Sequence, residues 1–203
     1  MVESNNLKLA SKEQTEEWLK ANDIWFHTVT HQEVFNIPAM LEEVKFTDLS
    51  EEEKLSETIF AKNLFLYNKA KKEQMWLVIA AHNTVFDMKD LCKHFGLKSG
   101  NLRGGSKELM EGILGTKSGV VNVFALLNDS ENKIKLIMDS RLMGNEYKHV
   151  GFHPMDNTAT TAVRQPQLQK IIDLTKHEAT VLDFSTIATA SSAAPKTAPP
   201  QKQ

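Results

Sequence analysis

The chain has almost no cysteine and no long apolar run. Cys92 is the single cysteine among 203 residues, which excludes an intrachain disulfide framework and suits a reducing compartment. No apolar stretch approaches the roughly 18 residues that a membrane-spanning helix needs. The N-terminal residues MVESNNLKLASKEQ are polar and acidic, unlike a secretory or mitochondrial signal. We therefore expect a cytoplasmic protein that does not contact a membrane.

Familiar catalytic and metal-binding signatures are also missing. The chain has neither a Gly-x-Ser-x-Gly nucleophile elbow nor a Walker-type glycine-rich loop. His27 and His31 are four residues apart, but their segment has a strand pattern, and no acidic residue has the spacing of a helical zinc site. Cys92 lies in a predicted amphipathic helix, where a buried structural thiol is expected. We expect no metal and no cofactor.

The composition does allow one folded domain. With 41% hydrophobic residues, a chain of this length can bury a core. From Thr186 the sequence turns to Ala, Ser, Pro and Lys, with no large apolar residue after Ile187. Such a segment cannot bury enough surface to order itself. We expect a domain over residues 1–185 and a disordered tail or linker over residues 186–203.

Charge is distributed unevenly along the chain. Residues 1–59 hold five lysines and thirteen acidic residues, a net −8. Residues 60–110 hold nine basic and four acidic residues, a net +5. The basic region is compatible with a phosphate-bearing partner, although charge alone favours a solvated lysine-rich surface.

Hydrophobic periodicity and turn residues predict an α+β domain. Helices are expected over residues 11–21, 38–44, 88–95, 106–114 and 166–175, with Ser11, Asp87 and Ser106 as N-caps. Strands are expected over residues 25–30, 64–67, 76–81, 120–127, 134–138, 158–163 and 180–184. The sequence predicts a charged turn over residues 68–74 and a hairpin over residues 120–138, with its turn at residues 128–130. Without strict β-α-β alternation, the pattern favours a mixed, largely antiparallel sheet with surrounding helices.

Lys62 stands out because it lies among apolar residues at the start of a predicted strand. If Leu64 and Leu66 face one side, Lys62 shares that side by the period of two. A lysine in this position either extends its amine to solvent along an apolar surface or meets an anion. The residues alone favour the first interpretation, in which the amine extends to solvent.

A second unusual segment reads Phe-His-Pro-Met-Asp-Asn-Thr-Ala-Thr-Thr-Ala-Val over residues 152–163. It is too polar for a core strand and too β-branched for a helix, and a strand whose hydroxyls face a cleft fits it better. Taken alone, a loop histidine such as His153 is more often a local hydrogen-bonding group than a catalyst.

These two segments together resemble the YbaK-like superfamily of aminoacyl-tRNA editing domains. Lys62-Asn63 matches the family's strand lysine motif, and residues 152–160 match the Phe-His-Pro and Asn-x-Ala-Thr pattern of the freestanding prolyl-tRNA synthetase-associated domain. Gly119 matches a glycine of the family's pocket loop, while Val123 occupies the position of the loop's proline. The resemblance covers about residues 8–185.

The resemblance implies a deacylase that hydrolyses mischarged alanyl-tRNA(Pro) and so proofreads translation. It implies a substrate-assisted reaction in which the terminal adenosine's free hydroxyl helps activate water. Lys62 would hold a phosphate or polarise the ester, and backbone amides around Gly119 would support the oxyanion. Asn63, His153 and Asn157 would orient the terminal nucleotide and the substrate amine.

The remaining residues implied by the resemblance are less specific. His31 matches a first-strand histidine of the family, and Thr158 and Thr160 offer small hydroxyls suited to a small substrate. Val123 leaves open which amino acid the pocket accepts. The implied partners are the aminoacylated acceptor end of tRNA and, further, prolyl-tRNA synthetase or a synthetase complex.

Three alternatives remain at this point. A non-catalytic tRNA-binding or synthetase-docking module would keep the basic region but have no need of Lys62 or His153. The chain could also be the editing domain of a fused prolyl-tRNA synthetase, joined through residues 186–203. A small-molecule-binding domain that reuses the fold is a third, because fold does not fix function.

Overall fold

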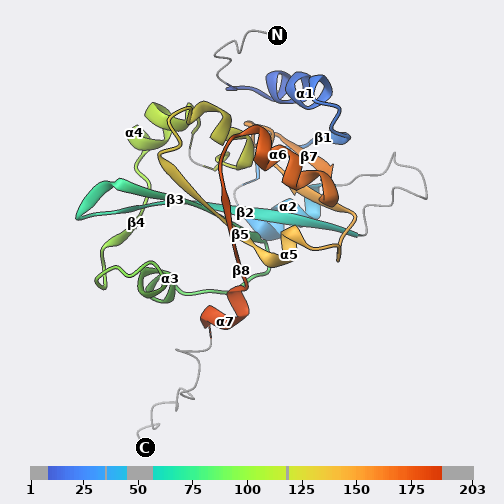
Figure 1. The fold of residues 1–203 in the computed structure, drawn as a ribbon. Helices are drawn as coiled ribbons and strands as arrows, with labels where there is room; N and C mark the ends of the chain where they lie inside the picture. The colour runs from blue at the N-terminus through green and yellow to red at the C-terminus, as the bar shows by residue number, and fades with distance from the viewer. Residues whose placement is uncertain (1–8, 35, 45–56, 118, 189–203) are drawn as a thin grey trace, which may run out of the picture.

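The computed structural model describes residues 9–34, 36–44, 57–117 and 119–188 (Figure 1). The strands are β1 Phe26–Thr30, β2 Thr58–Asn68, β3 Lys71–Ala81, β4 Leu102–Gly104, β5 Ile134–Asp139, β6 His149–Phe152, β7 Ala159–Arg164 and β8 Ala179–Leu182. The α-helices are α1 Lys12–Ala21, α2 Ile37–Glu43, α3 Met88–His94, α4 Lys107–Leu109, α5 Ser140–Met143, α6 Leu168–Leu174 and α7 Phe184–Ala188. The other helices are the π-helical η3 Met110–Leu114 and the 3-10 helices η4 Val123–Asn128 and η5 Gln165–Gln167.

The strands form one sheet in the order β1-β7-β6-β2-β3-β5-β8, with β4 added beside β2. The pairs β1–β7, β6–β7, β2–β3 and β2–β4 are antiparallel. The pairs β2–β6, β3–β5 and β5–β8 are parallel. The predicted α+β class with a mixed, largely antiparallel sheet is confirmed.

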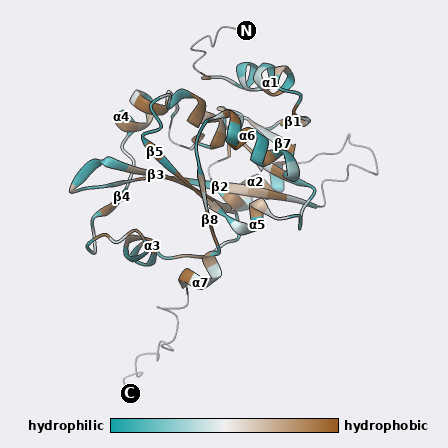
Figure 2. Cartoon of the chain, viewed as in Figure 1, coloured by the Kyte–Doolittle hydropathy of each residue, from teal (hydrophilic) through white to brown (hydrophobic). Residues whose placement is uncertain are grey.

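Helices cover both faces of the sheet, as Figure 1 shows. The larger core joins α1, η3, η4 and α6 to one face, and the smaller core joins α3 and α7 to the other. In the smaller core the rings of Trp76 and Phe95 stack with centroids 4.8 Å apart. The β2–β3 hairpin changes from hydrophobic in its middle to hydrophilic at its tip (Figure 2). The middle of the hairpin therefore belongs to the core, and its tip projects into solvent.

Elements that depend on local signals form where the sequence predicts them. Ser11, Asp87 and Ser106 each accept a backbone hydrogen bond as the N-cap of α1, α3 and α4. Gly96, the expected stop of α3, has φ of +66°, a left-handed conformation that favours glycine. The three N-cap side chains each satisfy a free N–H group in the first turn of their helix.

The predicted hairpin over residues 120–138 is wrong. Residues 123–128 form the helix η4, whose N-cap Asn122 accepts a hydrogen bond from the Phe124 N–H. β5 pairs instead with β3 and β8, both parallel to it. All four residues from Val123 to Leu126 are fully buried. A short run that is apolar at every position has no hydrophobic periodicity by which a strand could be distinguished from a helix.

The predicted charged turn over residues 68–74 is also wrong, because β2 and β3 run on as a long two-stranded ribbon. β2 ends at Asn68 and β3 begins at Lys71. The short strands β4 and β6 were not predicted. At the C-terminus, the expected domain boundary at residue 185 falls inside α7, whose Phe184 is buried against Phe86 with ring centroids 4.9 Å apart. The proposed tail beyond α7 lies outside the described residues.

The sheet has a gap beside β2, and this gap positions the site. β6 pairs with residues 58–60 of β2, and β4 pairs with residues 66–68. Gly151 permits the close approach of β6, because a Cβ there would lie 2.6 Å from the Phe60 ring. Beyond Phe152 the chain turns away, since Pro154 has no N–H to donate and Met155 adopts a φ of +62°. Among the described strands, residues 61–64 of β2 therefore pair with β3 alone.

Candidate active site

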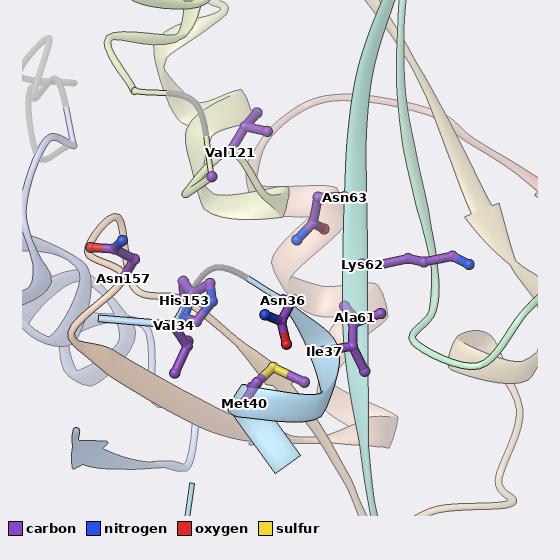
Figure 3. Close-up of a pocket in the computed structure, with 11 residues that line it drawn as sticks. Val34, Asn36, Ile37, Met40, Ala61, Lys62, Asn63, Val121, His153 and Asn157 are labelled. Atoms are coloured by element: carbon purple, nitrogen blue, oxygen red, sulfur yellow. The ribbon is translucent and has the colours of Figure 1, made fainter. Parts of the chain in front are cut away.

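A cavity of about 380 Å³ lies at this gap, and we call it the β2 cavity (Figure 3). It is lined by Val34, Asn36, Ile37, Met40, Ala61, Lys62, Asn63, Gly119, Val121, His153 and Asn157. Apolar side chains from the α2 segment form one wall, and polar groups come from β2 and from the loop after β6. Such a mixture of apolar walls and a few polar groups is typical of small-molecule sites.

His153 presents one ring nitrogen that is free to act as an acceptor. Its Nδ1 lies 2.9 Å from the Ala159 carbonyl oxygen, which can only accept, so Nδ1 carries the proton. Nε2 then keeps its lone pair in the neutral ring and takes no hydrogen bond from the described residues. Burial lowers the pKa of His153 below its ordinary value, and the nearby His31 lowers it further. The hydrogen bond to the Ala159 carbonyl and the charge of Asp156 raise this pKa, but the net shift is downward. The ring is therefore neutral at pH 7.

His31 and Thr160 lie behind His153 rather than in the cavity lining. His31 Nδ1 donates to the Gln32 carbonyl over 2.7 Å, so its Nε2 accepts from the Thr160 hydroxyl over 2.9 Å. The rings of His31 and His153 have centroids 6.0 Å apart. Thr160 is buried in β7, one residue after the carbonyl that holds His153. These two residues, predicted to bind substrate, lie where they can position His153.

Asn63 projects from β2 toward the side of the strand where His153 lies (Figure 3). Its Oδ1 is buried and has no hydrogen-bond partner among the described residues. A buried polar atom without a partner costs about 1–3 kcal/mol, and a ligand that donates a hydrogen bond removes this cost. An ammonium or hydroxyl group in the cavity would meet that requirement.

The ammonium of Lys62 lies on the opposite side of β2 from this cavity (Figure 3). It donates to the Thr84 carbonyl and lies 4.8 Å from the centroid of the Phe86 ring. Burial lowers the pKa of Lys62, while the nearby Asp139 raises it. Lys62 thus shares the face of Leu64 and Leu66, as its parity in the strand predicts. The cavity, however, lies on the side of Asn63, so the structure does not bring the Lys62 amine together with His153.

The other predicted residues divide between two neighbouring cavities. Gly119 lines the β2 cavity and has a φ of +93°, a backbone conformation that residues with a side chain rarely adopt. Asn157 also lines it. Thr158 lines an adjoining cavity instead, and its hydroxyl donates to Asp156 Oδ1 over 2.7 Å.

The sequence did not identify Asn122 or the apolar wall of the cavity. Asn122 is fully buried, and its Nδ2 donates to the carbonyls of Val120 and His153, which joins the pocket loop to the His153 loop. Ile37 and Met40 belong to α2 at the i,i+3 spacing that places them on one helix face, a signal available in the sequence. Val123 does not line the cavity; it is buried at the start of η4.

The described residues lack both a metal-binding cluster and a membrane-spanning helix. The part of the chain that the structure describes contains no group of three His, Cys, Asp or Glu residues able to hold a metal ion. No helix within the described ranges is long and apolar enough to cross a membrane. Independence from a metal and a cofactor stays a prediction. Among the residues that the structure describes, the lining of the β2 cavity contains no carboxylate, and His153 is the titratable lining residue whose ring is directed toward the cavity (Figure 3).

Fold and cavity together define an α+β domain with a small preformed pocket beside an interrupted sheet edge. Residues 42–171 match the family model described as "Aminoacyl-tRNA editing domain". The chain belongs to this family, as a YbaK-like editing domain of the prolyl-tRNA synthetase-associated type.

Individual relatives agree with this assignment. Prolyl-tRNA synthetase associated domain-containing protein 1 of Bos taurus is 31% identical over 169 residues, which are 83% of this chain and 92% of that protein. The prolyl-tRNA editing protein ProX of Acetoanaerobium sticklandii is 34% identical over 111 residues, 55% of this chain and 65% of that protein. A solved structure described as a proposed trans-editing enzyme for prolyl tRNA synthetase shares the fold at a TM-score of 0.55 and 13% identity, over 86% of this chain and 98% of its own.

Proposed function

We propose that this chain is a cytoplasmic deacylase that hydrolyses mischarged alanyl-tRNA(Pro). The observation that carries the proposal is a pair of acceptors at the β2 cavity, His153 Nε2 and Asn63 Oδ1, for which the described residues supply no hydrogen-bond donor. The α-ammonium of an aminoacyl ester and the hydroxyl of a terminal ribose are donors that such acceptors bind. The family membership supplies the substrate class, and the Phe152–Thr160 motif favours the prolyl-tRNA subgroup.

The reaction needs a positioned water, a proton acceptor and support for a developing oxyanion. His153 Nε2 would accept a hydrogen bond from the ribose hydroxyl or the water, and Asn63 Oδ1 would accept from the substrate ammonium. Gly119, at a positive φ, would direct backbone N–H groups of its loop to the oxyanion. The free hydroxyl of the terminal adenosine helps activate the water. Placement of the reacting groups can lower the barrier by several kcal/mol.

Selectivity would come from the apolar wall of the cavity. Val34, Ile37, Met40 and Val121 would admit a methyl group and exclude the ring of proline. A synthetase pocket built for proline cannot strongly reject a smaller amino acid, because each methylene is worth only about 1–3 kcal/mol. A separate hydrolytic sieve corrects that weakness.

A non-catalytic tRNA-binding module is the second candidate, and the position of Lys62 favours it. A lysine held on Thr84 and Phe86 contributes nothing to an ester on the other side of β2. Release of alanine from alanyl-tRNA(Pro) by the purified chain, measured against spontaneous hydrolysis, separates the two candidates. The exposed lysines of the β2–β3 hairpin tip and of α3 suit tRNA binding in both cases, and prolyl-tRNA synthetase is the proposed protein partner.

Lys62→Met is expected to lower kcat/KM for deacylation by about 100-fold. Residues 61–64 of β2 have no described strand on the cavity side, so the flexible lysine stem can turn around this open edge toward a substrate phosphate. Leaving the Thr84 carbonyl and the Phe86 ring costs about 1–2 kcal/mol, which an anion would offset. Methionine keeps the apolar stem but loses these two contacts, so the melting temperature should fall by only a few degrees. Turnover near that of the wild type would show that Lys62 serves only the fold.

A further inference from the structure

A second cavity of about 560 Å³ adjoins the β2 cavity, and we call it the α1 cavity. Asn157 lines both cavities, so they are neighbours. Its polar lining comes from Ser11 at the N-cap of α1, Glu33, Thr116, Lys117, Asp156, Asn157 and Thr158. The catalytic proposal above makes no use of this cavity.

Two polar groups of the α1 cavity have unused hydrogen-bonding capacity. Thr116 is 3% exposed, and its hydroxyl has no partner among the described residues. Asp156 accepts hydrogen bonds from the Thr158 N–H and hydroxyl through Oδ1, and none of the described residues donates to Oδ2. These two bonds from Thr158 lower the pKa of Asp156, with a smaller contribution from the charge of Lys12, so the carboxyl is ionised at neutral pH.

The charges of the α1 cavity argue against an anion as its ligand. Glu33 and Asp156 contribute two carboxylates, and Lys117 contributes one ammonium. A phosphate would be repelled by this excess of negative charge. An uncharged group that donates a hydrogen bond to a carboxylate is favoured, and the exocyclic amino group of a nucleobase is such a donor. Ala10, Val120 and Met155 add apolar surface for the flat faces of a base.

We propose that the α1 cavity binds the adenine base of the terminal adenosine, with Asp156 Oδ2 accepting from the N6 amino group. The inference rests on the proposed function, because the ester in the β2 cavity is covalently attached to that nucleoside. The neighbouring cavity is therefore where the base must go. The Thr116 hydroxyl donates to a ring nitrogen of the base. Recognition of unpaired bases at single-stranded ends by their edges is the usual mode of reading RNA.

The test is binding of uncharged RNA minihelices to the full chain, followed by fluorescence anisotropy. Their 3′ ends carry adenosine, purine riboside, which lacks only the amino group, or inosine, which has an oxygen in its place. The wild-type chain should bind the adenosine end about tenfold more tightly than the purine riboside end, because a hydrogen bond to a charged group is lost. Equal binding of these two ends would overturn the inference.

Asp156→Asn sharpens the test by reversing the preference. Oδ1 stays with the two Thr158 donors, so the new amide NH₂ takes the place of Oδ2 and donates. This variant should bind the inosine end more tightly than the adenosine end, and the wild-type ranking in Asp156→Asn would contradict the proposal. Glu73→Gln, at the exposed β2–β3 hairpin, removes one negative charge elsewhere and should leave the ranking unchanged. Thr116→Val should weaken the binding of the adenosine-ended and the purine-riboside-ended minihelices by the same factor.

These readouts need no hydrolysis, so the two proposals can fail separately. Hydrolysis of alanyl-tRNA(Pro) without a preference for the terminal base would overturn the adenine site alone. A base preference that follows Asp156, in a chain that hydrolyses no mischarged tRNA, would overturn the deacylase and support the adenine site.

Discussion

Replacing His153 with asparagine is expected to lower kcat/KM for deacylation of alanyl-tRNA(Pro) by about 100-fold. An asparagine NH₂ can replace Nδ1 as the donor to the Ala159 carbonyl, which keeps the loop in place. What the variant lacks is the Nε2 acceptor at the β2 cavity. His94→Asn, on the exposed side of α3, is the matched control and should retain full activity. A His153→Asn rate within twofold of the wild type would exclude this acceptor role.

The pH dependence should identify the same nitrogen. Burial lowers the pKa of His153, and only the neutral ring has a lone pair on Nε2. The rate should therefore rise with pH through this lowered pKa and become flat above it. The rising limb should be absent from the residual activity of His153→Asn. A limb that falls as pH rises through the same range would mean that the imidazolium is the active form.

Asp129→Ala is expected to lower the free energy of unfolding by about 3 kcal/mol. Asp129 is 3% exposed and accepts hydrogen bonds from the amides of Lys133 and Ile134 and from His177 Nε2 at 3.1 Å. His177 Nδ1 lies 2.8 Å from the Thr175 carbonyl oxygen, so both ring nitrogens of this buried side chain have hydrogen-bond partners. Removing the carboxylate leaves a buried ring and two amides without an acceptor.

For a domain of this size the corresponding fall in melting temperature is about 6–12 °C. Glu178→Ala, at an exposed position next to His177, is the control and should change the melting temperature by less than about 2 °C. Burial alone would raise the pKa of Asp129, but hydrogen bonds from His177, Ile134 and Lys133 lower it overall. This contribution to stability is therefore present above the unfolded-state pKa and is lost as pH falls through the lowered folded-state pKa. Equal melting temperatures for Asp129→Ala and Glu178→Ala would refute a stabilising role.

The sequence predicted the elements whose signals are local. α1 and α3 begin at their predicted N-caps because a short polar side chain satisfies the first free N–H groups wherever the rest of the chain lies. The pairing partners of β5 depend on segments far apart in the sequence, and the buried run from Val123 carries no period. No local rule could have placed them.

The candidate site was predicted in part for similar reasons. The motifs identified His153, Asn63, Gly119 and Asn157, and the structure gathers all four around the β2 cavity. The alternation of side chains in β2 correctly placed Lys62 with Leu64. It could not tell which face of the strand carries the cavity, because that depends on where β6 leaves the sheet. The support that Asn122 gives to two loops depends likewise on the folded chain.

The most direct test of the central claim measures initial rates of amino acid release by the purified chain from alanyl-, seryl-, cysteinyl- and prolyl-tRNA(Pro). We expect rapid release of alanine and protection of proline, because in our proposal the apolar wall of the β2 cavity acts as a sieve that admits a methyl group and excludes a ring. N-acetylated alanyl-tRNA(Pro) should react poorly, since it lacks the ammonium that Asn63 Oδ1 would bind. Faster release of cysteine than of alanine would indicate another branch of the superfamily. Release of proline at a rate comparable to that of alanine would contradict the account.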